Sequence, residues 1–314
     1  MNISDVQKNT IYKVISGSKM YGFSTENSDT DISGICVPYP KYYLGCAARF
    51  EQLEDKPNNT VIFGIEKFLR LAVGCNPNVI EILFIEKPEH ILLNTKWGRL
   101  IRDNRNLFLS AKAKFTFSGF AISQLHRIKN HRSWLLNPIE KKPTREDFGI
   151  SEKEFWGKNE LNALNKLMAD DIPVPTGVIE VVQRLNKYYN ALTNYNQYQN
   201  WKLNRNPVRA ALERKVGYDS KFAVHAIRLL RQGYEILTEG ILRSERPDAA
   251  ELKEIRNGSW SYEKLISYAE EMDSKLNEIY KKGGYAVPQY PPVNKISDLC
   301  EYIILDYWKT NNLI

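Results

Sequence analysis

A chain of 314 residues with 44 Lys+Arg and 37 Asp+Glu carries a net charge of +7, and 43% of its residues are hydrophobic. This length allows about two domains with a proper core, and the composition excludes an intrinsically disordered protein. No apolar stretch approaches the ~20 residues that a membrane helix needs. The N-terminus lacks a basic-then-apolar signal, so we expect a cytoplasmic protein with no membrane partner. The four scattered cysteines form no Cys-x-x-Cys pair, which predicts no disulfide partner and no zinc site.

The first 95 residues alternate strand-like and helical segments. Strands are predicted where short β-prone or apolar runs end at turn residues, over residues 12–16, 31–37 and 79–85. Apolar residues at helical spacing predict an amphipathic helix over residues 61–74, ended by Gly74 and the following Asn-Pro-Asn turn. This order predicts a small α/β or α+β catalytic core over residues 1–95.

Helical periodicity dominates the chain from residue 96 onwards. Helices are predicted over residues 96–106, 110–132, 176–193, 219–239, 261–281 and 296–310. Between the second and third of these, residues 137–158 are polar and contain two prolines, which predicts a long loop or hinge. The predicted fold is therefore an α+β protein, with the core at 1–95 followed by a mostly helical region at 96–314.

The positive charge is concentrated in two segments. Residues 96–145 hold twelve Lys+Arg against two Asp+Glu, a net of +10, and residues 201–246 have a net of +5. Two basic segments separated by an acidic one are typical of two walls of a cleft for a polyanion. The alternative is a pair of solvated helix faces.

Two carboxylates follow a glycine–serine turn. Asp29 and Asp31 are two residues apart, and in a strand such residues face the same side, where their charges repel unless a cation neutralises them. Mg²⁺ prefers hard oxygen ligands and shares them with substrate phosphates. The turn at Gly17-Ser18 offers backbone N–H groups and a hydroxyl to phosphate oxygens. The spacing therefore predicts a metal and nucleotide site here.

Glu81 is the candidate for a third carboxylate. It is alone in an otherwise apolar run, and a buried unpaired charge costs several kcal/mol. A third acid beside Asp29 and Asp31 would complete a two-metal site for in-line phosphoryl transfer. The alternative is a structural carboxylate paired with a nearby base.

These motifs resemble the DNA polymerase β nucleotidyltransferase superfamily, and most closely the RNA-repair-pathway polymerase-β family of bacteria and phages. The resemblance covers most of the chain, in the segments at residues 17–22, 28–34, 66–71, 76–84, 217–229, 246–248 and 254–258. Met20 departs from the small residue expected at its position. The resemblance implies that Gly17 and Ser18 hold the nucleotide phosphates and that Asp29, Asp31 and Glu81 are the catalytic, metal-binding carboxylates.

A basic stripe is predicted on the helix at 219–239. Lys221, His225, Arg228 and Gln232 recur at spacings of four, three and four, so they lie along one stripe. The functional interpretation is a clamp on the NTP triphosphate or on phosphates of an acceptor. The alternative is a solvated helix face.

The segment at 96–145 interleaves cations with aromatic residues, a pattern that suits single-stranded nucleic acid. Arg102, Arg105 and Lys129 are the candidate nucleic-acid-binding residues. The alternative is that the aromatic residues belong to the helix core.

The sequence thus predicts a nucleotidyltransferase that moves NMP from an NTP, with ATP expected, to an acceptor hydroxyl and releases pyrophosphate. The expected cofactor is Mg²⁺ as two ions, with Mn²⁺ as the substitute, and the expected acceptor is an RNA end such as a damaged tRNA. Two alternatives stay open: nucleotidylation of a protein or small-molecule hydroxyl, and a non-catalytic nucleic-acid-binding module.

Overall fold

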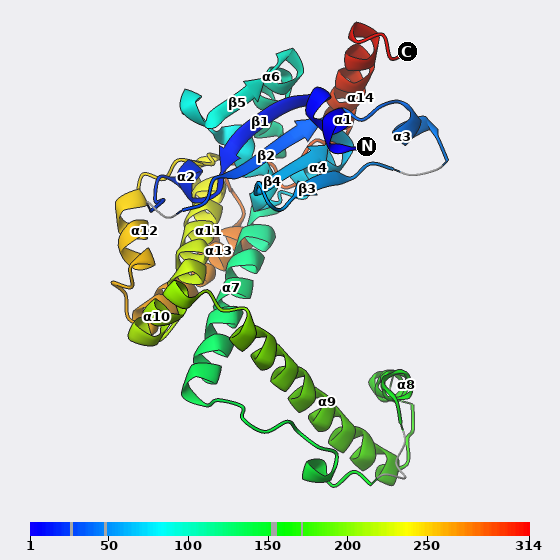
Figure 1. The fold of residues 1–314 in the computed structure, drawn as a ribbon, viewed down its shortest axis with the longest axis vertical. Helices are drawn as coiled ribbons and strands as arrows, with labels where there is room; N and C mark the ends of the chain where they lie inside the picture. Colours follow the sequence, from blue (N-terminus) through cyan, green and yellow to red (C-terminus); the bar gives the residue numbers. More distant parts are fainter. Residues whose placement is uncertain (26–27, 47–48, 152–155, 171) are drawn as a thin grey trace. The chain divides into compact units, whose positions relative to one another are not determined.

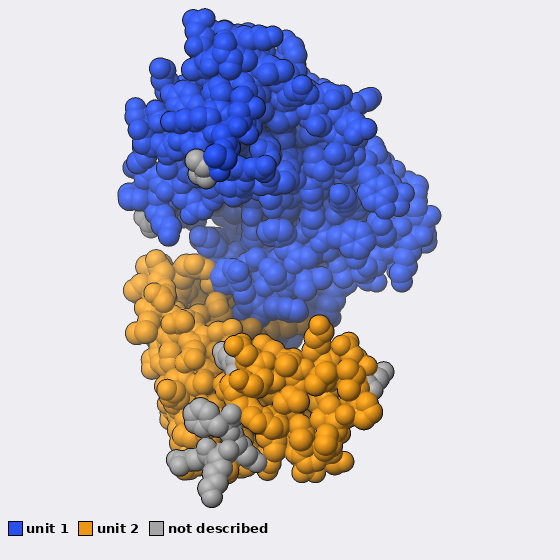
Figure 2. All heavy atoms as spheres, turned by 90° about the vertical axis from the view of Figure 1, so that its right-hand side faces the viewer, with its two compact units in different colours: residues 1–128, 220–314 blue, residues 129–219 orange. Residues whose placement is uncertain are grey.

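The computed structural model describes residues 1–25, 28–46, 49–151, 156–170 and 172–314. The chain divides into two compact units, coloured separately in Figure 2: residues 1–128 with 220–314, and residues 129–219. This division differs from the boundary expected at residue 95. The reason is that the helices after residue 220 pack their apolar faces with those of the first 128 residues, so both ends of the chain share one core.

The first unit is built on a five-stranded mixed sheet of order β3-β4-β2-β1-β5. Its strands are β1 (Thr10–Ser16), β2 (Asp31–Cys36), β3 (Gln52–Asp55), β4 (Thr60–Gly64) and β5 (Ile91–Asn94) (Figure 1). Strands β2 and β4 are parallel, and the other neighbouring strands are antiparallel. The β1–β2 register pairs Ser16 with Asp31, so β1 ends where β2 begins.

Helices from both ends of the chain cover this sheet. They are α1 (Ile3–Lys8), α4 (Ile65–Val73), α6 (Lys96–Asp103) and α14 (Val293–Thr310), whereas the short helix α3 (Lys41–Leu44) lies in the connection between β2 and β3 and buries no residue. Helix α14 is fixed by two aromatic side chains: Trp308 Nε1 donates to the Pro38 carbonyl at 2.9 Å, and Tyr307 Oη donates to Asn9 Oδ1 at 2.8 Å. The last helix of the chain therefore completes the core that the first strands begin.

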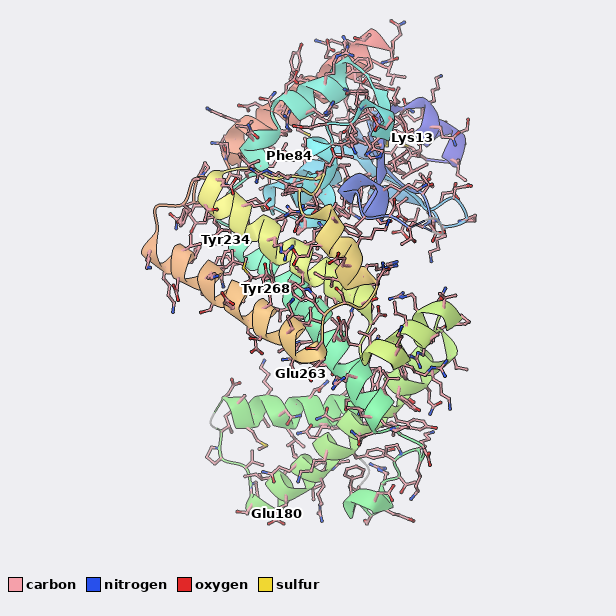
Figure 3. The ribbon with its side chains drawn as sticks, turned by 90° about the vertical axis from the view of Figure 1, so that its left-hand side faces the viewer. Lys13, Phe84, Glu180, Tyr234, Glu263 and Tyr268 are labelled. Carbon is pink, nitrogen blue, oxygen red and sulfur yellow. The ribbon has the colours of Figure 1, made fainter. Side chains whose placement is uncertain are left out.

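The helical part of the same unit lies beyond the end of the sheet at which β1 ends and β2 begins. It contains the start of α7 (Ala113–Leu136), together with α11 (Ser220–Glu239), α12 (Ala249–Arg256) and α13 (Tyr262–Lys282) (Figure 1). Polar contacts fix the helices to one another: Ser118 of α7 donates to Asp273 of α13 at 2.7 Å. Tyr268 of α13 points toward α11 (Figure 3), where Arg231 Nε donates to its hydroxyl at 2.9 Å.

The second unit is helical in its described residues. It contains η4 (Glu146–Phe148), α8 (Lys158–Ala169), α9 (Thr176–Leu203) and α10 (Pro207–Val216). Its buried core is Ile150, Leu161, Val182 and Leu185. Within the loop predicted at 137–158, residues 137–151 and 156–157 contain no regular element other than the short turn η4, α8 begins at Lys158, and residues 152–155 lie outside the described residues.

The predicted fold class is confirmed, since a small α+β core is combined with helices that occupy the later part of the chain. The strands predicted at 12–16 and 31–37 and the six predicted helices after residue 96 all form, with shifted ends. The elements that were not predicted include α1, α3, β3, β5, α8, α10 and α12.

Two local predictions are wrong. Residues 79–85 form no strand but the end of α5 (Pro77–Ile80) and the 3₁₀ turn η1 (Glu81–Phe84). The Asn76 side chain caps this segment by accepting from Asn78 N at 3.1 Å, and Pro77 fixes a helical φ at the first position. The first residues of the helix predicted at 61–74 belong to β4, because β-branched side chains there pair with β2.

The remaining connections are short turns, η2 (Pro88–His90) and η3 (Arg105–Phe108). All four cysteines are free thiols. Among the described helices, none combines the length and apolar character that crossing a membrane would require.

Candidate functional site

The candidate site begins where strand β1 ends in the short helix α2 (Gly17–Tyr21). Gly17 adopts φ +68°, in the left-handed region that favours glycine. A Cβ at this position would lie 2.1 Å from Asp31 Oδ2. The missing side chain is therefore what lets the Asp31 carboxylate pack against the Gly17-Ser18 turn.

Asp31 opens strand β2, and Asp29 precedes it; both residues are exposed. Partial burial raises the pKa of the Asp31 carboxyl, and the neighbouring Asp29 carboxylate raises it further. The Lys221 and Lys19 ammonium groups lower it, but the net shift is upward. Lys19 Nζ donates to the hydroxyl of Thr30, between the two carboxylates. The structure thus brings together four predicted site residues (Gly17, Asp29, Asp31 and Lys221), with Ser18 on the same turn.

The donors at this turn fit a hard divalent cation. Two carboxylates in electrostatic contact supply oxygen ligands, and Mg²⁺ completes its octahedral coordination with water and substrate phosphates. No group of three or more potential metal-ligating side chains forms within the ranges that the structure describes. Metal binding by Asp29 and Asp31 stays a prediction.

Glu81 lies in different surroundings from the other two acids. Its side chain is 1% exposed, on η1 rather than on a strand. Arg228 Nη1 donates to Glu81 Oε1, and the Tyr21 hydroxyl donates to Glu81 Oε2. Because both carboxylate oxygens have protein partners, the geometry favours the alternative of a structural carboxylate over a third metal ligand.

Arg228 is not on an exposed stripe. It is fully buried, as is Gln232, whereas Lys221 on the same helix is exposed. Arg228 Nη1 also donates to Gln232 Oε1 at 2.6 Å, and the centre of its guanidinium lies 3.8 Å from the centroid of the Tyr21 ring. Its charge is neutralised from within the protein by Glu81. Arg228 is therefore not available to clamp a triphosphate, and neither interpretation of the stripe describes it.

His225 completes this buried network as a neutral ring. Burial, together with the nearby cations Arg228 and Lys221, lowers the pKa of His225 to about 3. Its Nδ1 lies 2.9 Å from Arg228 Nη2, which carries only donors. The ring nitrogen must therefore accept, and His225 positions Arg228 rather than a phosphate.

The three predicted nucleic-acid-binding cations do not share one compact unit. Arg102 is half-buried, donates to the Ile85 carbonyl at 2.5 Å and lies over the Tyr12 ring. Arg105 donates to the Arg102 carbonyl at 3.0 Å and lies over Phe84. Lys129 is exposed but belongs to the other unit. The two arginines thus hold α6 and η1 together, which explains part of the basic concentration at 96–145.

Sequence reasoning missed three residues around Glu81. Tyr21 carries the hydroxyl bound to the carboxylate, Ser244 donates to the Glu81 carbonyl, and Arg246 N donates to the Tyr21 carbonyl at 3.2 Å. Tyr21 and Arg246 lie inside the motifs quoted for the family resemblance. Their place in these motifs marked them as candidates, but a role could not be assigned without knowing which residues they contact.

One comparison with known proteins supports the resemblance. Residues 2–138 match the model of the family described as RlaP, RNA repair pathway DNA polymerase beta family. Comparisons with curated proteins and with solved structures found no match. The family predicted from the motifs is thus confirmed for residues 2–138, which contain Gly17, Ser18, Asp29, Asp31 and Glu81. The match indicates a nucleotidyltransferase related to DNA polymerase β.

Replacing Gly17 tests the contact with Asp31. Gly17→Ala should lower the free energy of unfolding by more than the roughly 1–2 kcal/mol that a left-handed L-residue costs, because the added Cβ must also displace the Asp31 carboxylate. Gly22→Ala is the matched control, because Gly22 has φ +82° at the other end of α2 and a Cβ there meets only Ala249 Cβ at 3.4 Å. Chemical denaturation measures both variants, and equal losses would contradict a specific clash at Gly17.

His225 should make stability pH-dependent. Its pKa is about 3 in the folded protein against about 6.5 in an unfolded chain, so the unfolded state binds the extra proton between these values. The free energy of unfolding should therefore fall by up to about 1.4 kcal/mol per unit as pH drops from 6.5 toward 3.

Urea denaturation of His225→Gln across this pH range should show a slope reduced by that amount. His126→Gln, at an exposed position on α7, serves as the control and should keep the wild-type slope. A wild-type slope in His225→Gln would show that the histidine is not held neutral.

Proposed function

We propose that the protein is a metal-dependent nucleotidyltransferase that transfers NMP from an NTP to an acceptor hydroxyl, with release of pyrophosphate. The observation that carries the proposal is the contact of the Asp31 carboxylate with the Gly17-Ser18 turn, beside Asp29 and within reach of two lysine charges. The family match over residues 2–138 supports the same reaction class.

The residues of this site have separable roles in the proposal. Asp29 and Asp31 would hold Mg²⁺, which would neutralise charge on the phosphates of ATP and lower the pKa of the acceptor hydroxyl. The backbone N–H groups and hydroxyl at Gly17-Ser18 bind phosphate oxygens. Lys19 and Lys221 compensate the carboxylates and can bind the triphosphate as point charges. With Glu81 engaged elsewhere, the remaining ligands of a two-ion site would come from the triphosphate and water.

The acceptor we propose is an RNA end. Support comes from the family description, which names RNA repair, and from the net charge of +7, which favours polyanions. A protein or small-molecule hydroxyl is the second acceptor class.

The activity assay uses each α-³²P-labelled NTP with total RNA, with and without Mg²⁺. We expect Mg²⁺-dependent label in RNA, with ATP as the best donor. Label on the protein itself or on a small molecule would favour the second acceptor class. No Mg²⁺-dependent transfer from any NTP to any of these acceptors would contradict the proposal.

Removing one site carboxylate tests the metal assignment. Asp31→Asn or Asp29→Asn should lower transfer by at least ~10²-fold, because positioned metal charge supplies much of the rate. The fold should survive, since both residues are exposed. Asp103→Asn, at an exposed position at the end of α6, is the control and should keep full activity. Transfer within a few-fold of wild type in both site variants would remove the metal from these carboxylates.

RNA as acceptor requires salt-dependent RNA binding. Affinity should fall linearly with salt on logarithmic axes, with a slope set by the number of phosphates contacted, across ~50 to 200 mM salt. Filter binding of labelled RNA measures this slope, and the same titration with labelled ATP should show a shallower dependence. RNA that fails to bind even at the lowest salt would point to a protein or small-molecule acceptor.

A further inference from the structure

We propose that Tyr21, Glu81 and Arg228 form a positioning network that holds helix α2, and through it Ser18 and Asp31, in the geometry that nucleotidyl transfer requires. The inference rests on the proposed function and assigns these residues a role in the same site. None of the three touches the reacting atoms in this proposal. They act through α2, the element that carries the phosphate-binding turn.

Helix α2 is fixed at both ends. At its start, Gly17 packs against the Asp31 carboxylate, and Lys19 donates to Thr30. At its end, Tyr21 turns inward, 8% exposed, and its hydroxyl donates to Glu81. A helix of five residues has too few internal hydrogen bonds to hold itself. These end contacts therefore determine where the turn lies.

The inner end is held by charge as well as by the hydroxyl. The Arg228 guanidinium lies over the Tyr21 ring at 3.8 Å while it binds Glu81, so it clamps both the ring and the carboxylate that receives the hydroxyl. Burial raises the pKa of Tyr21 well above its ordinary value, so the phenol stays a donor. Arg228 is itself oriented by His225 and Gln232, one helical turn before and after it.

A second segment locks the network from the chain after α11. Ser244 donates to the Glu81 carbonyl, and Arg246 N donates to the Tyr21 carbonyl at 3.2 Å. The Arg246 side chain is held by Glu235 at 2.7 Å and by Asp248 at 2.8 Å. The turn that lies in the family-matched region is thus positioned by residues beyond residue 138. Completing the site requires the chain from 220 to 248.

The cleanest test removes a single hydroxyl. Tyr21→Phe keeps the ring under Arg228 and deletes only the hydrogen bond to Glu81. Tyr12→Phe is a matched control, because Tyr12 is also buried and its hydroxyl donates to the carbonyl of the adjacent η1 residue, Ile82, at 2.7 Å. Tyr12 contacts η1 from β1 and does not hold α2.

We expect Tyr21→Phe to lower kcat by about 10–100-fold, since small misplacements of positioned groups carry costs of this size, with a smaller change in KM for the NTP. The two variants should have similar melting temperatures. The increase in melting temperature caused by Mg²⁺ with a non-hydrolysable α,β-methylene NTP should shrink in Tyr21→Phe but not in Tyr12→Phe.

Removing both charges of the buried ion pair separates its role in positioning α2 from its contribution to stability. Arg228→Met leaves the Glu81 carboxylate buried without its cation and should lower the melting temperature strongly. Adding Glu81→Gln removes that charge and should recover most of the lost stability, yet transfer should stay low because Tyr21 has lost its clamp.

Three outcomes are decisive. An active wild type with an equally active Tyr21→Phe overturns the positioning role and leaves the proposed function intact. Wild-type kcat in the stable double variant does the same. An inactive wild type overturns the proposed function, and this inference falls with it.

Discussion

The buried ion pair between Glu81 and Arg228 is the interaction on which the first unit depends. Two charges withdrawn from water cost several kcal/mol each, and their attraction repays this only with good geometry and additional hydrogen bonds. Tyr21, His225 and Gln232 supply such hydrogen bonds here, while Arg228 Nε has no hydrogen-bond partner among the described residues. One consequence is geometric: a helix from the second half of the chain must lie against the 3₁₀ turn at Glu81, so the sheet and these helices form one compact unit.

The three acids near α2 show how surroundings assign different roles to one chemistry. Asp29 and Asp31 are exposed, and the charges of Lys221 and Lys19 act on the Asp31 carboxyl. Glu81 is 1% exposed and has a fixed cation and a fixed hydroxyl. An exposed pair of carboxylates can exchange its counter-ion. A buried carboxylate whose counter-ion is a protein side chain cannot. The exposed carboxylates of the candidate site and the buried network around Glu81 are therefore separated by only the few residues of α2.

What could be predicted from the sequence depends on how far apart along the chain the interacting residues lie. That Asp29 and Asp31 lie close to the Gly17-Ser18 turn was predictable because local spacing encodes it, and the long helices followed from their apolar periodicity. The run at 79–85 was misassigned, because a short segment that is apolar on every side has no period to read. Lys221 and Arg228 looked equivalent on one stripe. Only the partner of Arg228, 147 residues away, distinguishes a solvent-facing cation from a buried one.

The same separation in sequence has a consequence for biosynthesis. At about 5–20 residues per second, the ribosome needs roughly 7–30 s to pass from Glu81 to Arg228, which are 147 positions apart. During that interval the ribosome synthesises residues 129–219, which form a compact unit of their own. Glu81 has no Arg228 to pair with until this synthesis is complete. The nascent N-terminal part therefore has to avoid burying that carboxylate prematurely. The Gly17-Ser18 turn acquires its final support only after residues 129–219 have been synthesised.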